Sequence, residues 1–66
     1  MSVAKVTEIT ASSTKSFDDA IRLGIQRAST TIDQIQGAWI KEQKIVCDGE
    51  HIVEYRVTMK VTFVLK

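Results

Sequence analysis

The sequence has no proline, one cysteine and one histidine among its 66 residues. A lone cysteine, Cys47, excludes a disulfide within the chain, and one histidine with one cysteine falls short of the four N or S ligands of a structural zinc site. A chain this short forms a single domain, residues 1–66. It buries only about 60% of the surface that its unfolded form exposes, so a monomer would be marginally stable. With disulfides and metal set aside, we expect self-association to stabilise the protein.

Neither sign of charge dominates. Nine Lys and Arg side chains against eight Asp and Glu leave a net charge of +1, and each half of the chain is close to neutral. A basic surface for nucleic acid is therefore not expected. The sequence also lacks an apolar run long enough for a bilayer and the apolar segment of a secretory signal. We expect a cytoplasmic protein with no nucleic-acid or membrane partner.

Hydrophobic periodicity predicts an α+β fold with the element order β-α-β-β. The segments with period two are β-branched, and the segment between the first two has apolar residues at three- and four-residue steps. Ser16 is placed to cap the helix and Gly37 to end it. The predicted elements are a strand over 3–11, a helix of about 19 residues from Phe17, and strands over 38–47 and 51–65. They form a three-stranded antiparallel sheet partly wrapped around one long helix.

The third strand is longer than the helix. Fifteen residues of strand extend about 50 Å, whereas the helix extends about 28 Å. Met59, Val61, Phe63 and Leu65 would then be partly bare in a monomer, unless the first strand and its loop cover them. An apolar patch of this kind marks an interface, which again favours self-association.

The residue types that carry catalysis are not arranged for it. The chain has no nucleophile elbow and no phosphate-binding glycine loop. His51 is interpreted as a turn residue, Cys47 as a small packing residue, and the pair Asp18 and Asp19 as part of the helix start. We therefore predict that the protein is not an enzyme.

Trp39, the only tryptophan, is the strongest candidate for a ligand contact. Strict alternation in its strand places Lys41 and Gln43 on the same face. An indole with polar neighbours suits either stacking on a flat ligand or packing at an interface. The residue pattern alone leaves both interpretations open.

The hairpin that follows decides which side chains accompany Trp39. A two-residue type I′ turn at Asp48-Gly49 would pair Cys47 with Glu50 and Trp39 with Thr58. The face turned away from the helix would then carry Trp39, Lys41, Gln43, Glu54 and Arg56. A loop one residue longer would instead place Trp39 beside Met59 on the apolar face.

The whole chain resembles the dodecins, a family of small flavin-binding proteins. The resemblance rests on the helix opening SFDDAIRLGIQRAS, the segment Gly37-Ala38-Trp39 and the closing strand EYRVTMKVTFVL. It implies a hollow homododecamer with the helices outside. It also implies that flavins stack in pairs between tryptophans of symmetry-related subunits, where Trp39 would lie on the flavin ring and quench it by electron transfer. The implied role is flavin storage and buffering.

Arg56 departs from the family pattern, which often has glutamine at this position. Arginine only donates hydrogen bonds, whereas glutamine also accepts them. This departure favours FMN as the ligand, because an arginine can hold its phosphate bidentately and Lys41 on the same face could assist. Riboflavin stays open as the alternative. Some members also bind coenzyme A through arginines, at places where this chain has Val46 and Val64, so that role is weakened.

A second function from another class stays open. The chain could be a structural or protein-interaction homo-oligomer with no small-molecule ligand, in which Trp39 serves only as interface packing. Flavin absorption in the purified protein would distinguish the two.

Overall fold

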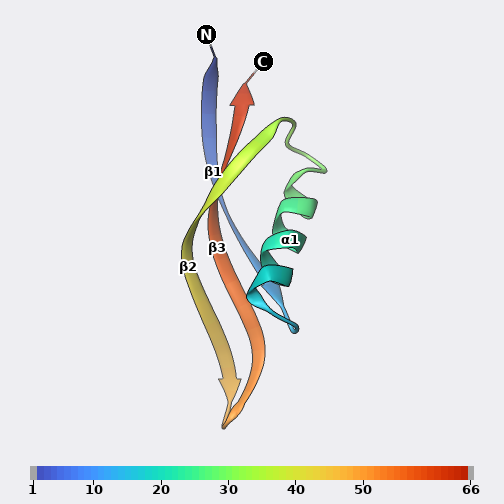
Figure 1. Ribbon diagram of the computed structural model, residues 1–66, viewed down its shortest axis with the longest axis vertical. Helices are drawn as coiled ribbons and strands as arrows, with labels where there is room; N and C mark the ends of the chain where they lie inside the picture. The colour runs from blue at the N-terminus through green and yellow to red at the C-terminus, as the bar shows by residue number, and fades with distance from the viewer. Residues whose placement is uncertain (1, 66) are drawn as a thin grey trace.

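The computed structural model describes residues 2–65. Its elements are β1 (Val3–Ser13), α1 (Phe17–Ala28), β2 (Ile35–Asp48) and β3 (His51–Leu65). The strands form one antiparallel sheet in the order β1-β3-β2, and α1 lies against one face of it, with both termini at the same end (Figure 1). The predicted β-α-β-β fold class is confirmed.

The helix begins as its sequence predicts. The Ser16 hydroxyl accepts the backbone N–H of Asp19 at 3.0 Å. The Asp19 carboxylate accepts the Ser13 hydroxyl at 2.6 Å and the Arg22 guanidinium at 2.7 Å. The hydrogen bond from Ser13, followed by that from Arg22, lowers the pKa of Asp19 below its ordinary value of 3.8. One carboxylate thus ties the end of β1 to the first turn of α1.

The predicted end of the helix is wrong. The helix ends at Ala28 after 12 residues, and the expected stop, Gly37, lies inside β2. The hydroxyls of residues 29 to 31 donate to the carbonyl oxygens three positions earlier, at 2.8, 2.7 and 3.4 Å. Side chains that bond to nearby backbone compete with helix propagation. Ile32 and Ile35 continue the helical spacing of apolar residues only by coincidence. Ile32 lies after the end of the helix, and Ile35 begins β2.

The core lies between α1 and the middle of β3. Its fully buried members are Ala20, Val57, Met59 and Val61. Side chains from β1, α1 and the start of β2 pack around them, namely Ile9, Ala11, Phe17, Ile21, Ile25 and Ile35.

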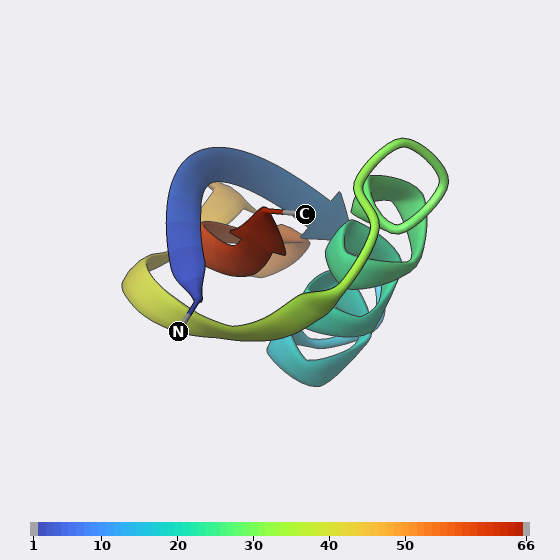
Figure 2. The same ribbon diagram turned by 90° about the horizontal axis from the view of Figure 1, so that it is seen from above.

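The expectation that the apolar side chains of the closing strand would be partly bare is therefore wrong for Met59 and Val61, which are 0% exposed. It is confirmed at the end of the strand, where Leu65 is 47% exposed. The curved sheet explains the difference, because β1 and the start of β2 wrap around β3 and close the sides of the core (Figure 2).

The hairpin between β2 and β3 follows neither predicted register. The last pair is Asp48 with His51, so the loop consists of Gly49 and Glu50. Gly49 has a φ of 62°, and Glu50 is not among the residues with positive φ. A type I′ turn needs positive φ at both central positions, so the predicted turn type is also wrong. Three irregularities interrupt the ladder, at Ile35/Gly37, Ile40/Glu42 and Val46/Cys47.

Candidate functional site

Trp39 is the most exposed large hydrophobic side chain of the described residues, at 65%. It lies in β2 opposite Lys60 of β3. The neighbours of Lys60 along the strand, Met59 and Val61, are buried under α1, so Lys60 and Trp39 face the other way. The predicted partner, Thr58, is wrong by two residues, but the predicted face is right because a shift of two preserves the alternation.

Lys41 is the extra residue of a bulge in β2. The ladder passes from Ile40 opposite Met59 directly to Glu42 opposite Thr58 and leaves Lys41 unpaired. Its ammonium lies 3.2 Å from the carboxylate of Glu8 in β1. Since β3 lies between β1 and β2, this ion pair spans the middle strand on the Trp39 face.

Arg56 lies further along the same face. Its Nε donates to the carboxylate of Glu54, so the terminal guanidinium nitrogens are available to an acceptor. Its partners across the sheet are Ser12 in β1 and Lys44 in β2. This row of the sheet therefore presents a hydroxyl, a guanidinium and an ammonium, all of them donors.

Gln43 does not join this group. It lies opposite Val57, which is fully buried on the helix side of the sheet. The predicted shared face of Gln43 and Trp39 is wrong, and the bulge at Lys41 is the reason. One inserted residue between the two positions exchanges the faces of everything on one side of it.

Three charged neighbours of this face were missed from sequence: Glu8, Lys44 and Lys60. The sequence could have placed Lys60 on this face, because it belongs to the polar half of the alternating pattern in the last strand. The sequence could not have placed Glu8 and Lys44 there, since their positions relative to Trp39 depend on strand order and on the bulge.

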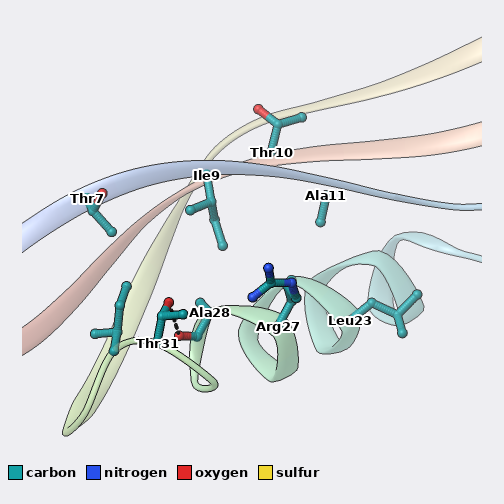
Figure 3. A pocket seen from close by; sticks show the side chains of 10 residues that line it. Thr7, Ile9, Thr10, Ala11, Leu23, Arg27, Ala28 and Thr31 are labelled. Carbon is teal, nitrogen blue, oxygen red and sulfur yellow. Dashed lines mark hydrogen bonds between the residues drawn. The ribbon is translucent and has the colours of Figure 1, made fainter.

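A groove of about 490 Å³ lies elsewhere, between β1 and the second half of α1. Figure 3 shows Ile9 and Ala11 pointing from β1 toward the helix, while Thr10 points away from it. The groove is thus on the helix side of the sheet, opposite the face of Trp39. Its lining residues are Thr7, Ile9, Thr10, Ala11, Leu23, Gly24, Arg27, Ala28, Thr31 and Ile32.

Residues 2–65 present neither a candidate metal site nor a membrane-spanning helix. These residues contain no group of three or more His, Cys, Asp or Glu side chains placed to hold a metal ion. In the same part of the chain, α1 is too short and too polar to cross a membrane.

The fold and the sheet face that carries Trp39 define a class of protein. It is a small α+β chain whose curved sheet is covered by its helix on one face only and carries an exposed indole on the other. Comparison with known proteins identifies the family. The Dodecin family model matches residues 3–66, and the chain belongs to the dodecin family.

Individual relatives agree with this assignment. The chain is 33% identical to the calcium dodecin of Mycobacterium tuberculosis (strain ATCC 25618 / H37Rv) over 66 residues, which are all of this chain and 93% of that protein. A solved dodecin from Streptomyces davaonensis superposes with a TM-score of 0.94 at 35% identity, over 98% of this chain and 96% of that one. The crystal structure of the Mycobacterium tuberculosis calcium dodecin, with a calcium-binding site, gives a TM-score of 0.84 at 31% identity, over 97% and 91% of the two chains.

Proposed function

We propose that this dodecin binds and stores flavin, FMN or riboflavin, by stacking the flavin ring on Trp39 within a homododecameric shell. One observation carries the proposal: the only tryptophan is 65% exposed, on the sheet face that the helix leaves uncovered. An aromatic side chain of this size ordinarily buries 150–250 Å² on folding or binding, roughly speaking. Trp39 therefore has contact area to gain from a ligand.

The residues of this face suit a flavin. The indole offers a flat apolar surface for the ring, and Lys41 and Arg56 offer donors to its oxygens or to a phosphate. Bound flavin would supply the visible absorption and the excited state that the indole quenches by electron transfer. The role of the chain is to bind and shield the flavin, without turnover.

The surface area of one copy supports assembly. A monomer of this mass typically exposes about 4,200 Å², whereas this chain exposes 4878 Å². The excess follows from a sheet that is covered on one face only. A second copy would cover apolar surface and supply the opposite wall of the flavin site, as the dodecin resemblance implies.

Titration of FMN and of riboflavin into apo-protein, followed by flavin fluorescence, tests the proposal. We expect strong quenching for the native chain. Trp39→Ala should abolish the quenching and weaken binding about 10-fold or more, because the stack is lost. Trp39→Phe is the matched control: it should keep part of the affinity, since it still stacks, and lose most of the quenching, since phenylalanine is a poor electron donor.

Two outcomes would contradict the proposal. If native protein leaves flavin emission unchanged, Trp39 is interface packing and the protein is a ligand-free homo-oligomer. If Trp39→Ala binds flavin as tightly as the native chain, the flavin does not stack on Trp39. Calcium belongs in the same series as a competing ligand, because one relative is a calcium dodecin. Calorimetric titration with CaCl₂ in the absence of flavin measures that binding separately.

A further inference from the structure

Gly37 occupies a position where the fold of one copy gives no reason for glycine. It lies inside β2, and a Cβ added there would meet nothing within 4 Å. Its φ is not positive, unlike that of Gly49. Glycine in the interior of a strand weakens the strand, because it has more backbone freedom to lose and no side chain to pack. Neither strain nor crowding within the chain explains why it is present.

The neighbouring bulge does not explain it either. The β2–β3 ladder is irregular between Ile35 and Gly37. The bulge type that requires glycine places it in the left-handed region, which Gly37 does not occupy. Another residue could therefore adopt the same backbone. What remains is the other common use of strand glycine, the close approach of a ligand or of another backbone.

Gly37 and Trp39 share one face of the sheet. Gly37 lies opposite Thr62 and Trp39 opposite Lys60, and alternate residues of a strand point the same way. Two residues of strand separate their Cα atoms by about 6.6 Å. Bare backbone therefore adjoins the exposed indole, on the side of Trp39 that leads to the start of β2. A flavin ring system is wider than an indole, so part of a stacked ring must extend past it.

We propose that Gly37 is a positioning residue for the flavin: it keeps the surface beside Trp39 free of side-chain atoms, so that the ring can extend from the indole over the β2 backbone. This inference rests on the proposed function. It deepens that function by assigning a residue that limits the size and orientation of the ring. A Cβ at position 37 would project from the same face and lift the ring off the indole.

Gly37→Ala and Gly37→Val test the proposal, because stability and binding should change in opposite directions. At a position with ordinary φ and open space, alanine reduces the freedom of the unfolded chain and valine suits a strand. The thermal midpoint of unfolding should therefore stay equal or rise. Affinity for FMN and riboflavin should fall, severalfold for Gly37→Ala and more than 10-fold for Gly37→Val. Ala38→Val is the matched control, since Ala38 faces the helix side opposite Val61, and its flavin affinity should stay within about twofold.

The measurements are fluorescence titration, the thermal midpoint, and the mass of the assembly by light scattering. Unchanged flavin affinity in Gly37→Val overturns the inference and leaves the proposed function intact. A Gly37→Val protein that no longer assembles also overturns it, because the glycine then admits another copy of the chain. Equal losses of flavin affinity in Gly37→Val and Ala38→Val overturn the inference as well. The loss would then not depend on which face of the sheet carries the added side chain. If the native protein binds no flavin, the proposed function itself fails.

Discussion

Arg56 and Lys44 lie directly opposite each other on β3 and β2. Like charges at facing positions of a sheet repel, so this row is strained electrostatically unless an anion or a carboxylate lies nearby. The Glu54 carboxylate accepts a hydrogen bond from Nε of Arg56. Lys44 forms no ion pair within residues 2–65. The row therefore has donors to offer a phosphate. Lys41, the helper expected from sequence, pairs with Glu8, and its ammonium keeps further N–H donors for a ligand.

The first prediction at this scale concerns ligand choice. Arg56→Gln restores the residue that dodecins often have, and glutamine can serve the ring edge but not hold a phosphate dianion. We expect the preference for FMN over riboflavin to fall about 3- to 10-fold, measured as the ratio of the two dissociation constants. The native preference should also weaken in 0.5 M NaCl, because salt screens exposed charges.

Lys44→Gln is the comparison for this change. It removes a charge from the same row and keeps the guanidinium. A smaller loss of FMN preference than in Arg56→Gln assigns the phosphate contact to Arg56. A ratio that stays unchanged in Arg56→Gln would show that the phosphate lies elsewhere.

At the scale of elements, the helix approaches the sheet closely because one of its residues has no side chain. A Cβ on Gly24 would lie 2.5 Å from the Met59 methyl carbon and 2.9 Å from the Ala11 Cβ. Both distances are far inside van der Waals contact. Met59 can move its flexible end, but Ala11 is fixed to the β1 backbone. Gly24 thus sets the spacing between α1 and the strands that it covers.

Gly24→Ala should therefore destabilise the protein although alanine favours helix. Helix propensity contributes about 1 kcal/mol in favour of alanine, while overpacking a filled core costs about 1–3 kcal/mol. We expect a net loss of about 1 kcal/mol in the free energy of unfolding, measured by chemical denaturation. Gln26→Ala, on the exposed face of the same helix, should be neutral or stabilising. A Gly24→Ala protein more stable than the native one would contradict this packing.

The whole molecule is long and thin, 51 × 19 × 13 Å. Apolar side chains remain exposed on both faces of the sheet. Ile40 and Ile45, 41% exposed each, lie opposite Met59 and Tyr55 on the helix side, beyond the edge of α1. On the other face Trp39 is exposed. A second copy of the chain can cover such surfaces, and this is the physical reason to expect assembly.

Light scattering tests assembly directly. We expect a particle of about twelve times the chain mass of 7.4 kDa. Ile45→Glu should shift the population toward smaller species, because a charge buried at an interface is costly. Glu50→Lys, in the exposed hairpin loop, should leave the mass unchanged. A native particle of single-chain mass would contradict the shell, and with it the completed flavin site.

Local sequence patterns were sufficient to predict several elements of this fold and the family of the protein. Alternation over His51–Leu65 predicted β3 with both its bounds, and Ser16 marked the start of α1. The segments around Trp39 and Arg56 were sufficient to identify the family. These features depend on residues close together in the chain, where capping, periodicity and motif spacing act directly.

The tertiary structure decided the rest. It placed Trp39 opposite Lys60, separated Gln43 from the indole and buried Met59. Each of these depends on contacts between distant segments: a bulge at Lys41 that shifts one strand against another, and strands that curl around Met59. Single-residue shifts in register leave the sequence pattern almost unchanged but exchange the faces of a strand, so only the packed sheet determines which side chains lie beside Trp39.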